Sequence, residues 1–238
     1  MKIHSRQSPL DLLWGTKRPI EVITVMIVDD HRLVRAGIRR VLDEQGDIEV
    51  AAEASSGEEA INLARDLQPQ VVLMDINMPG IGGLEATRRI IQRSPDIKII
   101  GVSMHLDEPY PSRLLSAGAS GYISKDSAAE EVVTAIRRVH QGGHYIAPLV
   151  AGNLAAALIK GQNESPFDAL SHREMQVMNL VTQGHSTQAI SDRLCLSPKT
   201  VSTYRYRLFE KLGVHNDVEL TRLAMRYGLL EDSVAAAD

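Results

Sequence analysis

The chain has 238 residues, of which 44% are hydrophobic, 24% charged and 4% aromatic, and this suits two globular domains better than one. No run of roughly 18 apolar residues is present, so we expect no membrane insertion. The first 20 residues contain no continuous apolar segment, so no secretory signal is predicted. Cys195 is the only cysteine, which excludes an internal disulfide, a Cys-rich zinc site and an iron–sulfur cluster and favours a cytoplasmic location.

Charge is distributed unevenly along the chain, although the total is only −4. Residues 21–145 carry 13 basic and 19 acidic side chains, whereas residues 169–230 carry 8 basic and 5 acidic ones. Opposite charges on two parts of a chain favour different partners for each part, and a basic part favours nucleic acid. The basic excess is small, so other features must support this interpretation.

From Val22 to His140, apolar runs of strand length alternate with segments of helical periodicity. The predicted strands are Val22–Val28, Ile48–Ala52, Val71–Met74, Ile97–Val102 and Gly121–Ser124. The predicted helices span about 31–44, 57–67, 83–92, 111–117 and 128–140. Strands that alternate with helices pair in parallel through right-handed crossovers. We therefore predict an α/β, doubly wound, five-stranded parallel sheet, with a site beyond the carboxyl ends of its strands.

The composition changes after Gly142 and Gly143, and the remaining chain shows no strand pattern. Residues 146–168 are punctuated by proline and glycine and are interpreted as a linker with a short helix inside it. Four helices are predicted after it, at about 171–183, 186–194, 198–211 and 216–228. The predicted organisation is a disordered N-terminal extension (1–20), an α/β domain (21–145), the linker (146–168), a small all-α domain (169–230) and a tail (231–238).

Three carboxylates follow predicted strands: Asp29 and Asp30 follow the first, and Asp75 follows the third. In a parallel sheet these ends share one edge, where neighbouring strands lie ~5 Å apart, so the carboxylates repel one another unless a cation lies among them. Carboxylate and carbonyl oxygens suit Mg²⁺, which also suits phosphoryl transfer. Lys125 and Ser103 follow the fifth and fourth strands and could reach the same edge. One such aspartate alone is more often a helix cap or turn residue, so the combination carries the argument.

Three segments resemble the receiver domain of bacterial response regulators, and the resemblance covers about residues 22–143. The segments are Val28-Asp29-Asp30-His31, Leu73-Met74-Asp75-Ile76-Asn77-Met78-Pro79-Gly80 with its continuation to Leu84, and Gly118-Ala119-Ser120-Gly121-Tyr122-Ile123-Ser124-Lys125-Asp126. Asp126 follows the lysine where many receivers have proline, which resembles the NarL/FixJ branch. The resemblance implies a CheY-like, flavodoxin-like fold.

The same resemblance implies roles for the residues at the sheet edge. Asp75 would be the phosphoacceptor, with a sensor histidine kinase as its phosphodonor. Asp30, Asp75 and the backbone carbonyl of Asn77 would bind Mg²⁺, with Asp29 acting through the shell of the metal. The residues implied to contact the phosphoryl group or to act as the switch are Ser103, Lys125 and Tyr122, of which the tyrosine turns inward on activation.

The basic part of the chain contains a pattern typical of a helix-turn-helix. Ser197 is predicted to cap a helix that has Pro198 at its first position and runs to Leu212. A short helix and a tight turn precede it, and its exposed polar residues lie near its N-terminus, as in a helix that reads the major groove. The solvated face of a small helical bundle gives the same pattern, so the pattern alone does not establish DNA binding.

Four segments resemble the LuxR-type DNA-binding domain over about residues 169–230. They are Leu170-Ser171-His172-Arg173-Glu174, Ile190-Ser191-Asp192-Arg193-Leu194, Leu196-Ser197-Pro198-Lys199-Thr200-Val201 and Lys211-Leu212-Gly213-Val214. The resemblance implies that Ser202, Thr203 and Tyr206 face the bases. The residues implied to contact phosphates are Lys199, Thr200 and Arg207. Arg205 stands where many relatives have an apolar residue, so its role is left open.

Further segments narrow the resemblance to the GacA/UvrY/LetA group of response regulators. These segments are Gly80-Ile81-Gly82-Gly83-Leu84-Glu85-Ala86-Thr87, Thr203-Tyr204-Arg205-Tyr206-Arg207 and Asn216-Asp217-Val218-Glu219-Leu220-Thr221. The resemblance implies a transcriptional regulator in which phosphorylation releases the DNA-binding domain or makes it form a homodimer. This domain then binds an inverted repeat in double-stranded DNA. It also implies a membrane-bound hybrid sensor kinase as partner. The implied target genes encode small regulatory RNAs, which act on a CsrA-type regulator.

Two other functions are compatible with parts of the sequence. A Mg²⁺-dependent phosphohydrolase with an aspartyl-phosphate intermediate needs a second acid two residues after its nucleophile, but this chain has Asn77 there, so we predict no enzyme. A DNA-binding regulator that is independent of phosphorylation would not need the complete set of acidic, hydroxyl and lysine residues. No function is predicted for the scattered histidines, which include His31, His105 and His144.

Overall fold

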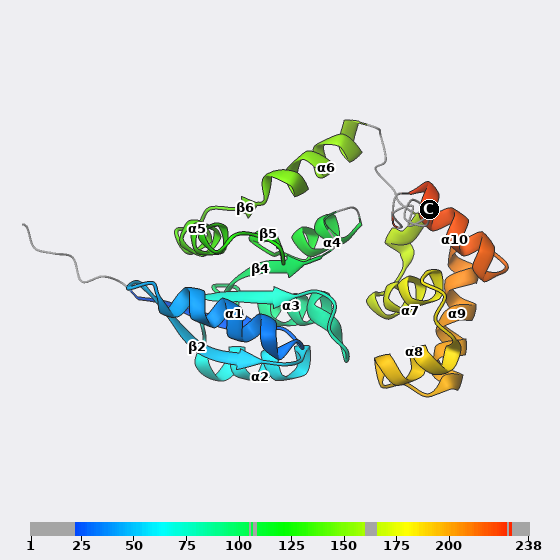
Figure 1. The fold of residues 1–238 in the computed structure, drawn as a ribbon, viewed down its shortest axis with the longest axis horizontal. Coiled ribbons are helices and arrows are strands. Elements are labelled where there is room, and N and C mark those ends of the chain that lie inside the picture. Colours follow the sequence, from blue (N-terminus) through cyan, green and yellow to red (C-terminus); the bar gives the residue numbers. More distant parts are fainter. Residues whose placement is uncertain (1–21, 105, 107–108, 160–165, 228, 230–238) are drawn as a thin grey trace, which may run out of the picture.

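The computed structural model describes residues 22–104, 106, 109–159, 166–227 and 229. The predicted extension 1–20 and the tail 231–238 therefore lie outside the described residues, as does the middle of the predicted linker. Figure 1 shows an α/β layer formed by the first part of the chain and a separate group of helices formed by the last part. None of the described helices is long and apolar enough to span a bilayer.

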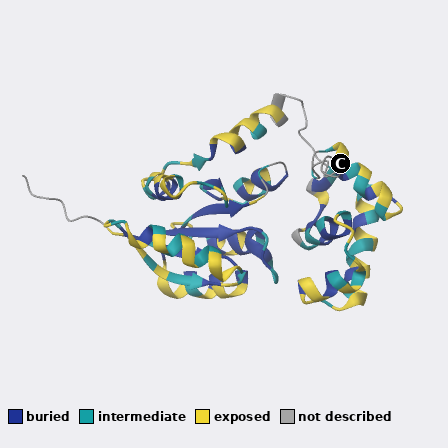
Figure 2. Ribbon diagram, viewed as in Figure 1, coloured by how far each residue is buried: buried dark blue, intermediate teal, exposed yellow. Residues whose placement is uncertain are grey.

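The sheet is parallel throughout and has the strand order β2-β1-β3-β4-β5-β6. Its strands are β1 (Ile23–Val28), β2 (Ile48–Ala54), β3 (Val71–Asp75), β4 (Lys98–Ser103), β5 (Gly121–Ser124) and β6 (Tyr145–Ile146). Every residue of β3 is buried, because helices cover both faces of the sheet (Figure 2). This explains why central strands such as β1 and β3 are nearly continuous apolar runs rather than alternating patterns.

The predicted doubly wound parallel fold is confirmed, but the sheet has six strands rather than five. The additional strand, β6, contains only two residues, and Tyr145 pairs with Gly121 of β5. Two residues are too few to produce a periodic pattern, so this strand could not be predicted from hydrophobic periodicity.

Five helices pack on the sheet, and each side of the sheet has its own core. The helices are α1 (Arg32–Asp43), α2 (Gly57–Leu67), α3 (Gly82–Arg93), α4 (Tyr110–Ser116) and α5 (Ala129–His140). Leu42 of α1 and Ile136 of α5 belong to one apolar cluster, whereas Ala60 of α2 and Ile90 of α3 belong to the cluster on the opposite face. The strand ends between these helices form the edge that carries the polar residues.

The helical part begins after α6 (Pro148–Ile159), the helix that the sequence placed inside the linker. A short 3-10 turn (Pro166–Ala169) leads into α7 (His172–Thr182), α8 (Thr187–Leu194), α9 (Pro198–Leu212) and α10 (Asp217–Arg226). Ser197 caps α9, accepting a hydrogen bond from the backbone N–H of Thr200 at 3.1 Å, as the sequence predicted. Val201 and Leu208 of α9 are fully buried, which fixes the face of this helix that points away from solvent.

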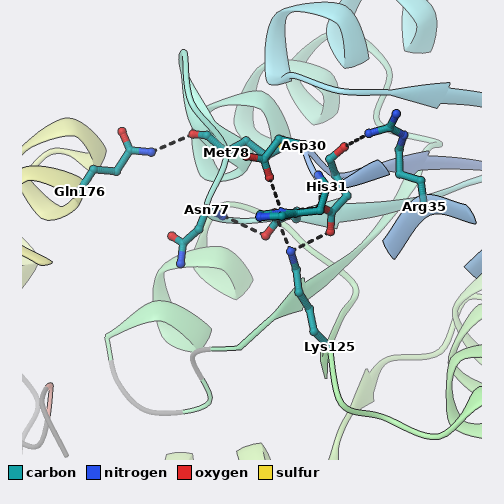
Figure 3. A network of polar contacts seen from close by, with 9 residues as sticks. Asp30, His31, Arg35, Asn77, Met78, Lys125 and Gln176 are labelled. Atoms are coloured by element: carbon teal, nitrogen blue, oxygen red, sulfur yellow. Dashed lines mark hydrogen bonds and ion pairs between the residues drawn. The ribbon is translucent and has the colours of Figure 1, made fainter. Parts of the chain in front are cut away.

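A network of polar contacts joins the helical part to the sheet domain. The side-chain amide of Gln176 on α7 donates a hydrogen bond of 2.8 Å to the backbone carbonyl of Met78, in the loop after β3 (Figure 3). Asn179 on the same helix is hydrogen-bonded to the hydroxyl of Tyr110. Burial of Tyr110 raises the pKa of this hydroxyl to about 12. Phe167, Met178 and the sheet residue Tyr122 share one apolar cluster. The helix α7 is therefore docked beside the carboxyl edge of the sheet.

Candidate functional site

The register of the sheet brings the predicted carboxylates together. Val28 of β1 pairs with Met74 of β3, so the next residues, Asp29 and Asp75, lie side by side at the carboxyl edge. Both are almost completely buried, with 2% and 1% of their surface exposed. A group formed by Asp29, Asp30, His31 and Asp75 places one potential ligand atom from each residue within 4.8 Å of the others. The predicted acidic edge is therefore present.

Lys125 supplies the cation that two of these carboxylates need. Its Nζ lies 2.7 Å from Asp29 Oδ2 and 2.8 Å from Asp75 Oδ2. Lys125 follows β5, and Figure 3 shows its side chain extending toward the loop that carries Asp30 and His31. A lysine in this position can bind a phosphoryl oxygen as a point charge once one is attached to a neighbouring carboxylate.

Burial and ion pairing shift the pKa values of Asp75 and Lys125 in opposite directions. Burial raises the pKa of Asp75, and the hydrogen bond from Lys125 opposes this shift. For Lys125, burial acts to lower the pKa, but hydrogen bonds to Asp29 and Asp75 outweigh it, so the pKa is raised. The lysine therefore remains cationic at neutral pH and offsets part of the repulsion between the two carboxylates.

The remaining oxygens of the cluster fit a divalent cation. Asp30 Oδ1 is buried and receives no hydrogen bond of acceptable geometry, although His31 Nδ1 lies 2.9 Å away. Asp75 Oδ1 accepts a hydrogen bond of 3.1 Å from the backbone N–H of Asn77, which holds this carboxylate in one orientation. An unsatisfied buried carboxylate oxygen among other oxygens is the donor set that Mg²⁺ prefers.

The backbone after β3 approaches the site closely enough to require glycine. The N–H of Gly83, at the start of α3, donates a hydrogen bond of 3.1 Å to the carbonyl of Ile76. A Cβ at Gly83 would lie 1.9 Å from the carbonyl oxygen of Asp75. This close approach fixes the path of the loop that carries Asn77 and Met78 and so the geometry around the acidic edge.

The two other residues expected near the phosphoryl group are both buried. Ser103 ends β4 with 1% of its surface exposed, and its carbonyl accepts a hydrogen bond of 2.9 Å from the backbone N–H of Lys125. Tyr122 on β5 is fully buried among the residues of the cluster that also contains Leu114. The structure therefore shows the tyrosine ring in an inward position.

His31 belongs to the site although the sequence argument gave it no function. Its backbone N–H donates a hydrogen bond of 2.8 Å to Asp29 Oδ1, and its ring Nδ1 lies 3.2 Å from the same oxygen. The sequence argument considered the spacing between histidines, whereas His31 contacts the two aspartates that directly precede it in the chain. Its position directly after the paired aspartates was the available signal.

The predicted DNA-contacting residues gather on one side of α9. Val201 and Leu208 face inward, whereas Tyr206 keeps 69% of its surface exposed. Thr200 is half-buried, and Lys199, Ser202, Thr203 and Arg207 are all exposed. Figure 1 shows α7 and α8 on the side of the helical part that is nearer the sheet, with α9 on the other side. The polar face of α9 is therefore accessible while α7 is docked.

The structure gives Arg205 a role that the sequence left open. Its guanidinium lies 2.6 Å from both carboxylate oxygens of Asp217, and it donates a hydrogen bond of 3.0 Å to the hydroxyl of Thr187. Arg205 therefore ties α9 to the beginnings of α8 and α10. Nη2 contacts both oxygens of Asp217 and Nη1 contacts Thr187, so the guanidinium is held at two of its nitrogens.

Two protein families match the chain, one for each part of the structure. The response regulator receiver domain matches residues 25–137, and the bacterial regulatory proteins of the luxR family match residues 168–224. Response regulator GacA of Pseudomonas aeruginosa is 51% identical over 211 residues, which cover 88% of this chain and 99% of GacA. The chain belongs to the GacA/UvrY family of response regulators.

Further relatives and solved structures agree with this assignment. Response regulator UvrY of Escherichia coli K12 is 52% identical over 209 residues, which cover 87% of this chain and 96% of UvrY. The RcsB response regulator of Salmonella typhimurium superposes with a TM-score of 0.62 at 26% identity, over 87% of this response regulator and 98% of RcsB. RcsB bound to the rprA promoter in the presence of BeF3⁻ gives a TM-score of 0.59 at 26% identity, over 85% of this chain and 98% of RcsB.

Proposed function

We propose that this response regulator is switched by transfer of a phosphoryl group from a sensor histidine kinase to Asp75 and then binds an inverted repeat in double-stranded DNA as a homodimer. The observation that carries the proposal is the environment of Asp75. This buried carboxylate lies 2.8 Å from the ammonium group of Lys125 and shares its pocket with an unsatisfied oxygen of Asp30. Burial, a fixed cation and a carboxylate oxygen that could bind a metal ion are the features that a phosphoacceptor needs.

The chemical step at Asp75 is an exchange of one phosphorus bond for another. A carboxylate oxygen of Asp75 forms a bond to phosphorus, the bond between phosphorus and the donor's histidine nitrogen breaks, and the imidazole keeps the electron pair and takes up a proton. Lys125 moves from the carboxylate to a phosphoryl oxygen and neutralises part of its charge. Mg²⁺ held by Asp30, Asp75 and the Asn77 carbonyl would neutralise further charge on the phosphoryl oxygens.

The helical part contributes the contacts with DNA. We propose that α9 enters the major groove with Ser202, Thr203 and Tyr206 toward the base edges. The proposed phosphate contacts are made by Lys199, Thr200 and Arg207. Support comes from the exposure of this polar face and from the match to the luxR family. Arg205 is excluded from the base-reading set because Asp217 and Thr187 already hold its guanidinium.

The docked arrangement favours a switch that controls the pairing of two DNA-binding domains over one that uncovers α9. The polar face of α9 is exposed even though Gln176 on α7 holds the Met78 loop. Opening the two domains is therefore not required to uncover α9. An inverted repeat requires two DNA-binding domains in a fixed relation, and a domain held against its own receiver is restricted in forming that relation. Phosphorylation of Asp75, next to the Met78 loop, would weaken this docking and so remove the restriction on pairing.

The finer physiological proposal rests on the similarity to GacA and UvrY. We propose that the target promoters are those of small regulatory RNAs that act on a CsrA-type RNA-binding protein, and that the phosphodonor is a membrane-bound hybrid sensor kinase. RNA sequencing of strains that carry the wild type or Asp75→Asn tests this proposal. A response confined to messenger RNA promoters would contradict it.

DNA affinity with and without phosphorylation tests the proposed function as a whole. A duplex selected from a random library by the full chain is labelled, and its binding is followed by fluorescence anisotropy before and after incubation with acetyl phosphate and Mg²⁺. We expect phosphorylation to tighten wild-type binding by about 10-fold or more, within the usual range for coupling between two sites. Asp75→Asn should show no change, since its amide cannot accept the phosphoryl group. Equal wild-type affinity before and after phosphorylation would indicate a regulator that is independent of phosphate.

A further inference from the structure

Arg35 lies one turn into α1 and is directed back toward the end of β1. Its Nη1 donates a hydrogen bond of 2.6 Å to the backbone carbonyl of Asp29 (Figure 3). Its Nε donates a second hydrogen bond of 3.2 Å to Glu53 Oε2 on β2. Only 15% of the Arg35 side chain is exposed, so these contacts form away from most of the solvent. The guanidinium group thus spans the backbone beside the acidic edge and a carboxylate on the neighbouring strand.

The contact from Arg35 and one backbone hydrogen bond restrain the two peptide groups on either side of Asp29. The backbone N–H of Asp29 donates a hydrogen bond of 3.1 Å to the carbonyl of Ala54, at the end of β2. The carbonyl of Asp29 belongs to the peptide group that joins it to Asp30, and Arg35 holds that carbonyl. Because a peptide group is planar, fixing its oxygen fixes the direction in which the chain enters Asp30. The carboxylate of Asp30 carries the unsatisfied oxygen of the site.

Glu53 is itself held in place by two arginines. Arg39, one turn after Arg35 on α1, is hydrogen-bonded through its Nε to Glu53 Oε1. The hydrogen bond from Arg39 is the largest influence on Glu53 and, with the one from Arg35, holds the pKa of this carboxyl below its usual range despite partial burial. Glu53 therefore stays ionised and provides a fixed partner for the Arg35 guanidinium. In the part of the chain that the structure describes, the hydrogen bond to the Asp29 carbonyl comes from Arg35 and not from Arg39, although both arginines contact Glu53.

We propose that Arg35 is a positioning residue of the divalent-cation site, which fixes the Asp29–Asp30 peptide so that the Asp30 carboxylate is preorganised for Mg²⁺. This inference rests on the proposed function only for the identity of the cation. Arg35 touches neither the carboxylate oxygens nor the reacting atoms, and it acts through the backbone. Partners beyond the direct ligands typically change metal affinity by about 10- to 100-fold when they are removed.

Direct titration with Mg²⁺ tests the proposal on the unphosphorylated full chain. Isothermal titration calorimetry with MgCl₂ is performed on the wild type, Arg35→Gln and Arg39→Gln. We expect Arg35→Gln to weaken Mg²⁺ binding by about 10-fold, at the lower end of the range for residues outside the direct ligands. Arg39→Gln removes the same charge from the same helix but leaves the Asp29 carbonyl contact. A change below about 3-fold in Mg²⁺ affinity is therefore expected, which is the scale of a single side-chain pair on a helix surface. Arg40→Gln, whose side chain is 86% exposed, is the surface control.

Kinetics of phosphorylation by acetyl phosphate provide the second readout. In Arg35→Gln, the Mg²⁺ concentration for half-maximal rate should rise by about 10-fold. The rate at saturating Mg²⁺ should stay within about 2-fold of the wild-type rate, since Arg35 does not touch the reacting atoms. A distorted fold would instead lower the rate at every Mg²⁺ concentration. If Arg35→Gln does not fold, Glu53→Ala decides the question, since it removes the carboxylate that orients Arg35 and should weaken Mg²⁺ binding in the same direction.

Equal Mg²⁺ affinities for Arg35→Gln and the wild type would overturn the proposal, as would an equal loss in Arg35→Gln and Arg39→Gln. A wild type that binds no Mg²⁺ would overturn it together with the metal-dependent part of the proposed function. A wild type that binds Mg²⁺ but takes up no phosphoryl group would contradict the proposed function alone. In that case the calorimetric comparison still decides whether Arg35 positions Asp30.

Discussion

Tyr206→Ala is expected to lower the affinity of the phosphorylated protein for its specific DNA site by about 1–3 kcal/mol, or about 5- to 150-fold. The side chain is 69% exposed on the polar face of α9, so truncation should change the buried core little. Binding to a scrambled duplex should change much less, because contacts with base edges carry sequence information and phosphate contacts do not. Thr203→Ala should behave in the same way. The measurement is anisotropy on specific and scrambled duplexes at several salt concentrations.

Lys199→Ala is the matched control for this prediction. Lys199 is exposed on the same helix and is expected to contact a phosphate, so its removal should weaken binding to both duplexes and lower the salt slope by about 1. If Tyr206→Ala weakened binding equally on both duplexes, Tyr206 would be removed from the base-reading set. A salt slope lowered by Tyr206→Ala would lead to the same conclusion.

Lys125→Ala is expected to slow phosphorylation by acetyl phosphate by about 10²- to 10³-fold at saturating Mg²⁺, which is the usual cost of removing one donor to a developing charge. Lys125 Nζ lies 2.8 Å from Asp75, so it is in reach of a phosphoryl oxygen on that carboxylate. The same variant should bind Mg²⁺ at least as tightly as the wild type, because Asp29 and Asp75 then lack their cation. Intact mass at timed intervals gives the rate, and calorimetry gives the affinity.

Lys98→Ala serves as the control for Lys125→Ala. Lys98 begins β4 and therefore lies at the opposite edge of the sheet from the carboxylates, so neither the rate nor the Mg²⁺ affinity should change. A normal rate in Lys125→Ala would show that the lysine only neutralises the resting carboxylates. Weaker Mg²⁺ binding in that variant would show that Lys125 organises the metal ligands instead of competing with the metal.

The acidic edge could be predicted from the sequence because the topology of parallel sheets is nearly deterministic. Apolar runs located the strands, and residues that directly follow neighbouring strands must lie at the same edge. The structure accordingly brings Asp29, Asp75 and Lys125 within hydrogen-bonding distance, although Lys125 is 50 residues from Asp75 in sequence. The motifs around these residues supplied the expected chemistry.

Contacts that depend on side-chain length and domain docking could not be predicted in this way. Arg35 reaches the Asp29 carbonyl from a helix whose charged residues otherwise look like a solvated face. Gln176 meets the Met78 carbonyl across 98 residues of chain, and no periodic pattern encodes such a pair. Arg205 was ambiguous because its partner, Asp217, lies on a different helix. Each of these contacts is set by tertiary packing rather than by local propensity.

Intact mass after incubation with acetyl phosphate and Mg²⁺ tests the central claim most directly. The full-length wild type and Asp75→Asn are compared under identical conditions, with circular dichroism to show that both are folded. The account predicts one phosphoryl group on the wild type and none on Asp75→Asn. A phosphoryl group on both proteins would place the acceptor elsewhere, and the absence of one on the folded wild type would contradict the assignment of Asp75 as an acceptor for this phosphodonor.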